Sequence, residues 1–393
     1  MYTIKFFIGI GLLGMLVSCH QSSKTFKKFE MLNSQDTGVS FQNTIDESSM
    51  SVFDYVNMYN GAGVAVADFD KDGYQDLFFA GNLVSSRLYL NNGKIRPLSF
   101  LDKTKESGIG TNTWVNGVTV VDIDQDGWDD IYCSVSGGKS GKNRANLLFL
   151  NKGIDAEGRI SFEEKAAQYH LNDTTHTIQS AFFDYDGDND LDVFMIVNHP
   201  TGYLDSEANR ITRIEKIGNT ERTDRLYRND GVGADGHPVF TDVSQKAGIT
   251  LEGFSLGLAI NDFNEDGKPD IYVANFYVTN DIIYVNNGDG TFTDRIRDYV
   301  NHTSFASMGI DVADINNDGM QDFMVLDMLP EEDAKVKMMY PAVDHIGFSM
   351  RKKIGYVNQY NRNVLQFNNG QRDSIPLKFS EIGRFSNVFN TNW

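Results

Sequence analysis

Oxygen-bearing side chains recur at alternate positions of a nine-residue pattern that occurs five times in the chain. Aspartate or asparagine occupies positions 1, 3, 5 and 9, and position 6 is glycine, or asparagine in the third copy. A backbone that turns at position 6 brings these oxygens toward one point, and glycine and asparagine best tolerate such a turn. We number the copies loops 1 to 5; they are residues 68–76, 122–130, 184–192, 262–270 and 314–322.

Each loop is expected to bind Ca²⁺, so that the chain holds up to five ions. Hard oxygen ligands in a flexible cage suit Ca²⁺ better than Mg²⁺, which prefers a small octahedron and its own water molecules. Positions 1, 3, 5 and 9 are expected to bind through side chains and position 7 through its backbone carbonyl. The expected metal ligands are Asp68, Asp70, Asp72, Tyr74, Asp76, Asp122, Asp124, Asp126, Trp128, Asp130, Asp184, Asp186, Asp188, Asp190, Asp192, Asp262, Asn264, Asp266, Lys268, Asp270, Asp314, Asn316, Asp318, Met320 and Asp322.

The loops are not EF-hands, because an EF-hand needs a glutamate at position 12. That position is occupied by Phe79, Cys133, Met195, Val273 and Val325. Alternating apolar residues precede each loop and a short apolar run follows it, so each loop is predicted to join two strands of a hairpin. A lone loop of this kind could be an Asx-rich turn that binds nothing. Five copies in one setting argue against that alternative.

Two further strands are predicted in every repeat, which gives four antiparallel strands in each. The third ends in an Asn/Gly turn, and the fourth begins with phenylalanine. Four short strands in repeats of this length are typical of a propeller blade. The sequence therefore predicts an all-β fold, a β-propeller of four-stranded blades, with repeats at about 60–110, 114–171, 176–250, 254–300 and 306–388.

These repeats resemble the VCBS/FG-GAP repeat family, which is related in plan to the propellers of integrin α-subunits. More closely, the chain is similar to bacterial lipoproteins of the cartilage-acidic-protein-like (ASPIC/UnbV-associated) group. The resemblance covers about residues 29–393 and rests on the loops, the Asn-Asn-Gly turns and the Gly-Ile pairs at 108–109 and 248–249. It implies Ca²⁺ bound to a propeller and a role in surface adhesion or recognition. The ASPIC/UnbV segment itself is not visible in this chain.

The N-terminus has the features of an export signal. Residues 1–18 contain one charge and an apolar run too short to span a bilayer, which is typical of a signal peptide. Leu16–Cys19 resembles a lipobox, which predicts lipidation at Cys19, a polar tether at 19–28 and attachment to the outer membrane or cell surface. The alternative is an ordinary secretory signal with a chance cysteine. Lipidation would leave Cys133 without a disulfide partner, as a buried apolar residue.

Charge narrows the range of partners. The chain has 35 Lys and Arg against 54 Asp and Glu, a formal net charge of −19. Nucleic acids and anionic lipid surfaces attract basic proteins, so neither is an expected partner, and membrane contact is expected through the lipid anchor only.

Both ends of the propeller region look incomplete. Residues 29–44 resemble a fourth, outer strand without its first three, and residues 390–393 resemble 111–114, which precede loop 2. We therefore expect an orphan strand at the start, the beginning of a sixth repeat at 390, and a chain truncated at its C-terminus.

Two insertions exceed the blade template, at residues 199–223 and 328–362. Long loops on a rigid scaffold often carry recognition. In the second insertion, an aromatic and cationic ligand surface could form from Tyr340, Phe348, Tyr356, Tyr360, Arg351 and Arg362. The alternative is that both insertions only cap the propeller.

Function remains open between a binding module and an enzyme. The sequence contains no HExxH, GxSxG, P-loop or CxxC motif. The favoured hypothesis is a calcium-stabilised, lipid-anchored surface module that binds a glycan or a protein. The alternatives are a polysaccharide lyase or hydrolase on a calcium propeller and, by family analogy alone, a scaffold subunit of an outer-membrane uptake complex.

Overall fold

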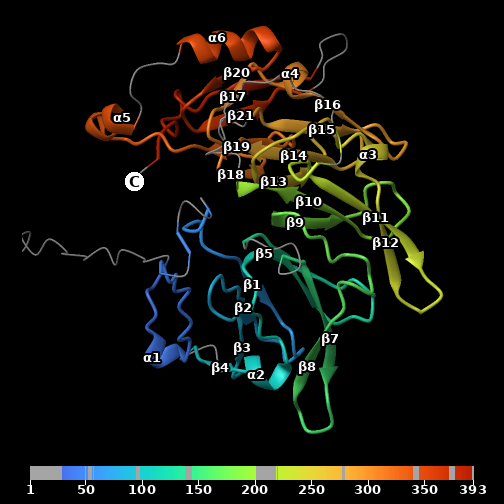
Figure 1. Ribbon diagram of the computed structural model, residues 1–393. Coiled ribbons are helices and arrows are strands. Elements are labelled where there is room, and N and C mark those ends of the chain that lie inside the picture. The colour runs from blue at the N-terminus through green and yellow to red at the C-terminus, as the bar shows by residue number, and fades with distance from the viewer. Residues whose placement is uncertain are drawn as a thin grey trace, which may run out of the picture.

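Five four-stranded antiparallel sheets follow one another along the chain in the computed structural model (Figure 1). The structure describes residues 29–391 except 49, 52–54, 56, 94–97, 138–143, 201–217, 219, 277–278, 340–344 and 371–376. We call the sheets blades 1 to 5. Their inner strands β1, β5, β9, β13 and β18 contact one another in chain order. The predicted all-β, propeller-like fold is confirmed.

The strands of each blade pair in the order in which they occur in the chain. Blades 1 and 2 consist of β1 (Val64–Ala67), β2 (Asp76–Phe79), β3 (Arg87–Asn91), β4 (Phe100–Asp102), β5 (Val115–Val121), β6 (Asp130–Val135), β7 (Leu147–Ile154) and β8 (Ile160–Glu164). Blades 3 and 4 consist of β9 (Thr177–Phe183), β10 (Asp192–Val197), β11 (Arg225–Val232), β12 (Pro238–Asp242), β13 (Ser255–Asn261), β14 (Asp270–Asn275), β15 (Ile282–Asn286) and β16 (Phe292–Asp294). Blade 5 consists of β18 (Gly309–Ala313), β19 (Asp322–Leu326), β21 (Val364–Asn368) and β22 (Phe379–Glu381).

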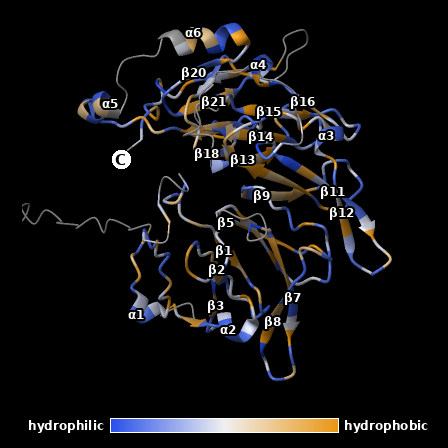
Figure 2. Ribbon diagram, in the orientation of Figure 1, coloured by the Kyte–Doolittle hydropathy of each residue, from blue (hydrophilic) through white to orange (hydrophobic). Residues whose placement is uncertain are grey.

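Hydrophobic cores form between neighbouring blades. In β10, Phe194 and Ile196 join the core shared with blade 4, whereas Val193 and Met195 join the core shared with blade 2. Successive side chains of a strand point to opposite faces, so a strand between two cores must be apolar throughout. Figure 2 shows hydrophobic residues along the strands and hydrophilic residues in many connections.

Short helices finish several blades. They are α2 (Thr104–Ser107), α3 (Ser244–Ala247) and α4 (Ile296–Tyr299), which follow the fourth strands of blades 1, 3 and 4, whereas α1 (Ser34–Thr37) precedes blade 1. Both α2 and α3 end at a glycine with a left-handed backbone, Gly108 (φ 79°) and Gly248 (φ 85°). The isoleucine that follows each glycine, Ile109 or Ile249, is fully buried, so the Gly-Ile pair turns the chain and anchors it in the core.

The prediction of an outer strand over 29–44 is wrong. Asn33 caps the one-turn helix α1 by accepting a hydrogen bond from the Asp36 amide, and Gly38 ends it with φ 77°. These local bonds compete with an extended backbone. The segment still covers blade 1, because the Phe41 ring stacks on the Phe79 ring with centroids 5.3 Å apart.

The second insertion is partly helical. It contains α5 (Asp333–Met339), α6 (His345–Ile354) and the short strand β20 (Asn358–Tyr360), which pairs in parallel with β17 (His302–Ser304). Most of the first insertion, residues 199–223, lies outside the described residues. Near the C-terminus, Thr391 forms an isolated parallel bridge with Pro330.

Candidate metal-binding loops

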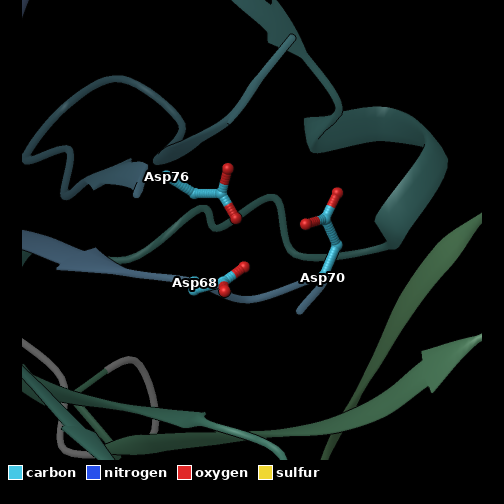
Figure 3. A group of neighbouring side chains, drawn as sticks. All are labelled: Asp68, Asp70 and Asp76. Atoms are coloured by element: carbon cyan, nitrogen blue, oxygen red, sulfur yellow. The ribbon is translucent and has the colours of Figure 1, made fainter. Parts of the chain in front are cut away.

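In each of loops 1 to 3, the carboxylates at positions 1, 3 and 9 lie close together. In loop 1 these are Asp68, Asp70 and Asp76, whose oxygens approach within 4.8 Å of one another around a common space (Figure 3). The other two groups are Asp122, Asp124 and Asp130, and Asp184, Asp186 and Asp192. Loops 4 and 5 have asparagine at position 3 and therefore one carboxylate fewer.

The position-1 aspartate closes the turn in all five loops. Its carboxylate accepts a hydrogen bond from the position-6 amide, at N–O distances from 2.7 Å in loop 4 to 3.0 Å in loop 3. Position 6 has positive φ in every loop, including Asn189 at 73°, so the expectation that asparagine preserves the turn is confirmed. Position 4 also has positive φ in every loop, a feature that the sequence pattern did not reveal.

The position-5 aspartate forms an Asx turn. Its carboxylate accepts a hydrogen bond from the position-7 amide at 2.8–3.0 Å in all five loops. The position-5 residues lie outside the three carboxylate groups described above. One oxygen of each is thus committed to shaping the backbone.

The position-9 aspartate is buried and ties the loop to the third strand of its blade. In loop 1, one oxygen of Asp76 accepts from the Phe69 amide at 2.9 Å, and the other accepts from the Asn91 amide at 2.7 Å. The other four loops repeat this pair of bonds. The residues at position 9 are 0–1% exposed, so they are fixed parts of the fold as well as potential ligands.

Burial favours the protonated form of these carboxyls. Desolvation, partly offset by the two amide bonds and reinforced by neighbouring carboxylates, raises the pKa to about 7 in Asp76, Asp130, Asp192 and Asp270. The pKa of Asp322 is also raised by burial. A cation at such a site replaces the proton and neutralises the crowded charges. The donor set, carboxylate and amide oxygens on a pre-shaped turn, fits a hard divalent cation.

The side chain at position 7 packs over the Asn/Gly turn of the third strand. A Cβ added to Gly153 would lie 2.8 Å from Trp128, and one added to Gly370 would lie 2.7 Å from the Met320 sulfur. The backbone of both glycines is left-handed, with φ of 70° and 66°. The turn glycine is therefore required both by the turn and by the loop residue above it.

Sequence reasoning missed a role for the third-strand asparagines. They are Asn91, Asn151, Asn229, Asn286 and Asn368, which the sequence pattern assigned only to turns. Each donates its backbone amide to the position-9 aspartate of its own blade. Three of them also donate from the side chain to a neighbouring loop. The recurrence of asparagine two residues before the turn glycine was the available signal.

The arginines of the second insertion are not available for a ligand surface. Arg351 is 8% exposed and its guanidinium lies 4.9 Å from the centre of the Phe305 ring. Arg362 forms an ion pair with Glu381 at 3.0 Å. Arg362 thus holds the insertion against blade 5, and Arg351 holds it against the segment that leads into this blade, which supports the capping alternative.

The aromatic residues of that insertion divide in the same way. Tyr356 is 9% exposed, and Phe348 lies against Tyr360 with ring centroids 6.0 Å apart. Tyr360 is 41% exposed, whereas Tyr340 lies outside the described residues. The predicted aromatic and cationic cluster therefore does not form one exposed face among the described residues.

The predicted lipidation site, Cys19, lies outside the described residues. Cys133 is a free cysteine with no exposed surface, and burial raises the pKa of its thiol. Within the described part of the chain, no helix combines the length and the apolar character needed to cross a bilayer.

Comparison with protein families agrees with the repeats seen in the structure. The family model described as "FG-GAP-like repeat" matches residues 68–133 and 262–325, which contain loops 1, 2, 4 and 5. The chain carries FG-GAP-like repeats. The first match begins at position 1 of loop 1 and ends in β6, and the second begins at position 1 of loop 4 and ends in β19.

The chain is distantly related to cartilage acidic protein 1. It is 25% identical to the mouse protein over 216 residues, 26% identical to that of Xenopus tropicalis over 222 residues and 24% identical to the human protein over 222 residues. The matches cover 54–56% of this chain but only 28–29% of those relatives. The Vibrio cholerae biofilm matrix protein Bap1 superposes with a TM-score of 0.32 at 14% identity, over 67% of this chain and 34% of Bap1.

Proposed function

We propose that the five loops each bind one Ca²⁺ and that calcium stabilises the propeller. The observation that carries this proposal is the repetition of one hydrogen-bonded frame in all five loops. The carboxylate at position 1 accepts a hydrogen bond from the amide of position 6, and the carboxylate at position 5 accepts one from the amide of position 7. The carboxylate at position 9 accepts hydrogen bonds from the amide of position 2 and from an amide of the third strand. A frame that leaves several carboxylates facing one space needs a cation to offset their mutual repulsion.

Calcium suits these loops better than other common cations. The donors are hard oxygens from a flexible loop, with three or four side-chain carboxylates in each. Asn264 and Asn316 replace carboxylates in loops 4 and 5, so these two sites should be weaker than the others.

Elemental analysis of the purified protein tests this assignment. After dialysis against millimolar calcium, we expect bound calcium approaching five ions per chain, with loops 4 and 5 emptying first as free calcium is lowered. Binding of less than one ion at millimolar free calcium would contradict the proposal.

At the level of the molecule, we propose a lipid-anchored surface module that binds a glycan or a protein. FG-GAP-like repeats on a propeller-like scaffold support a binding role, and the acidic charge disfavours nucleic acid. Arrays of glycans and extracellular proteins, probed with and without calcium, test this role. We expect the protein to bind one or more array ligands and to lose this binding when calcium is removed. An array on which the protein binds no ligand would argue against the binding role.

A further inference from the structure

Asparagine side chains connect the candidate calcium loops of neighbouring blades. The Nδ2 atom of Asn286 in blade 4 donates to the Tyr185 carbonyl in loop 3 at 2.7 Å. The equivalent atom of Asn368 in blade 5 donates to the Phe263 carbonyl in loop 4 at 3.2 Å. Asn151 in blade 2 does the same to the Phe69 carbonyl in loop 1 at 2.9 Å. Each acceptor is the residue at position 2 of its loop.

These bonds complete a continuous path between two position-9 aspartates. In blade 2, Asp130 accepts from the Asn151 amide at 2.7 Å, and the Asn151 side chain donates to the Phe69 carbonyl. The Phe69 amide in turn donates to Asp76 of loop 1 at 2.9 Å. The side chain of one buried asparagine and the backbone of one buried phenylalanine therefore separate a ligand of loop 2 from a ligand of loop 1.

The paths lie away from water. Asn151, Asn286 and Asn368 are 1%, 2% and 3% exposed. A hydrogen bond in such a setting is stronger than one in water, and leaving either partner unpaired is costly. These bonds therefore join neighbouring loops along paths that are shielded from solvent.

In blade 3, the third-strand asparagine does not form the hydrogen bond to the preceding loop. Among the described residues, the Asn229 side chain donates to the Leu191 carbonyl of its own blade at 3.4 Å and makes no bond to loop 2. The five loops thus fall into two connected groups, loops 1 and 2 and loops 3 to 5. A second contact supports the first group, because the Lys71 ammonium of loop 1 lies 4.1 Å from the centre of the Trp128 ring of loop 2.

We infer that the calcium loops are coupled through these asparagines, within the groups 1–2 and 3–5 but not between loops 2 and 3. The inference rests on the proposed calcium binding. A cation that fixes a position-9 carboxylate also restrains the position-2 residue whose amide is bonded to it. That residue then offers a more ordered carbonyl to the asparagine of the next blade. The neighbouring loop then loses less entropy when it binds its own ion.

Loop 2 can be observed by itself with Tb³⁺, a luminescent probe for calcium sites. Trp128 is in loop 2, and no other calcium loop contains a tryptophan. Because Trp128 also lies beside loop 1, the emission that remains when loop 2 is disabled by Asp124→Ala is subtracted as the share of loop 1. The remainder reports occupancy of loop 2, and Trp128→Phe should remove most of the emission. About 0.5 M salt, where the Debye length is near 4 Å, limits long-range effects of charge between loops.

Disabling loop 1 with Asp70→Ala should weaken Tb³⁺ binding at loop 2 by at least about fivefold, the lower end of typical coupling. Loop 1 with Tb³⁺ bound combines four carboxylates with three positive charges, whereas the emptied Asp70→Ala loop keeps three carboxylates and no ion. This more negative loop would by itself strengthen Tb³⁺ binding at loop 2, so a weakening identifies coupling. Disabling loop 3 with Asp186→Ala should leave loop 2 unchanged, because no asparagine bond joins them.

The asparagine is tested by repeating the Asp70→Ala comparison in two backgrounds. In Asn151→Ala, loop 2 should no longer respond to loop 1. In the matched control Asn229→Ala, which removes the corresponding side chain without breaking a bond between loops, the response should remain. If Asn151→Ala does not fold, the difference between Asp70→Ala and Asp186→Ala still decides the grouping.

The outcomes separate this inference from calcium binding itself. The coupling would be overturned if loop 2 binds Tb³⁺ but its affinity is unchanged by Asp70→Ala, or is changed equally by Asp70→Ala and Asp186→Ala. Either result would leave calcium binding itself intact. A response that survives in Asn151→Ala would overturn the role of the asparagine. Absence of sensitised emission from the unmodified protein would overturn both.

Discussion

At the scale of single residues, the loops differ in the number of charged oxygens at position 3. Asp70 in loop 1 corresponds to Asn264 in loop 4, and both lie on the same hydrogen-bonded frame. The side-chain oxygen of each accepts a hydrogen bond from the backbone amide at position 5, with N–O distances of 3.2 Å in loop 1 and 3.0 Å in loop 4. The frame therefore accepts either residue, and the difference between the loops is one of charge.

We predict that Asn264→Asp strengthens calcium binding at loop 4 and that Asp70→Asn weakens it at loop 1, each by roughly tenfold, about 1.4 kcal/mol. Calorimetric titration of each variant measures the change. A change of the same sign in both variants would show that charge at position 3 does not set the affinity.

Buried carboxyls outside the loops make stability depend on pH. Asp281 accepts hydrogen bonds from the Asn275 amide at 2.8 Å, Tyr272 at 2.7 Å and Ser307 at 2.9 Å, yet desolvation raises its pKa to about 7. Because the pKa is higher in the folded state than the ordinary 3.8, ionisation favours unfolding. The folded state is most favoured below about pH 4, and this contribution is lost as pH rises through 7.

We predict that Asp281→Asn reduces the fall in the free energy of unfolding between pH 5 and pH 8 by on the order of 2 kcal/mol. Asparagine already occupies the equivalent position in blades 2 and 5, where Asn146 and Asn363 accept the same kind of amide bond. Urea unfolding at both pH values, in saturating calcium, gives the comparison. An unchanged pH dependence would show that Asp281 does not titrate in this range.

At the scale of elements, the strand-turn-strand unit depends on glycines below the loops. Gly153 and Gly158 lie in one hairpin and both have left-handed φ, 70° and 78°. A side chain at Gly153 would meet Trp128 of loop 2, whereas one at Gly158 would meet nothing within 4 Å. The two positions therefore separate backbone strain from a clash with the loop.

We predict that Gly158→Ala destabilises the fold by about 1 kcal/mol and Gly153→Ala by at least about 1 kcal/mol more. Only Gly153→Ala should also weaken calcium at loop 2, because it displaces Trp128. Chemical unfolding with and without calcium measures both effects. Equal destabilisation by the two variants would mean that the contact with Trp128 is unimportant.

The elements that the sequence predicts well are those specified by nearby residues. Each hairpin follows from a loop and its flanking apolar runs within about twenty residues, and the Asn/Gly turns mark the third strands. Contacts between blades could not be predicted this way. The bond from Asn286 to Tyr185 joins residues 101 positions apart, and nothing local distinguishes Asn286 from Asn229, which lacks such a bond.

The error over residues 29–44 has the opposite origin. Thr37-Gly38-Val39 looks like the end of an outer strand when compared with other repeats. Local capping by Asn33 and the left-handed Gly38 instead produce a single helical turn. The same one-turn helix and left-handed glycine end blades 1 and 3, at α2 with Gly108 and α3 with Gly248. The resemblance to the other repeats therefore holds for the helical turn and fails only for the strand.

At the scale of the whole molecule, attachment to a membrane depends on Cys19, which remains a prediction of the sequence. We expect Cys19→Ser to move the protein from the membrane fraction to the soluble fraction, because a lipid anchor is the only expected membrane contact. Fractionation and immunoblotting measure the distribution. A variant that stays in the membrane pellet with unchanged mobility would contradict lipidation.

The stability of the whole fold is expected to depend on bound calcium. Five sites that each contribute up to about 2.7 kcal/mol at a hundredfold excess of calcium over the dissociation constant would equal the stability of a typical domain. Magnesium should not substitute, because it dehydrates reluctantly and demands a smaller octahedral site. The pKa of about 7 at position 9 implies that protons partly replace calcium below neutral pH, so the effect should be greatest near pH 8.

The most direct test is the melting temperature of the purified protein at pH 8 in millimolar calcium, in EDTA, and in EDTA followed by excess magnesium or calcium. We predict a fall of more than ten degrees in EDTA, full recovery with calcium and little recovery with magnesium. A melting temperature that is the same in EDTA and in calcium would contradict a stabilising role of calcium in this fold.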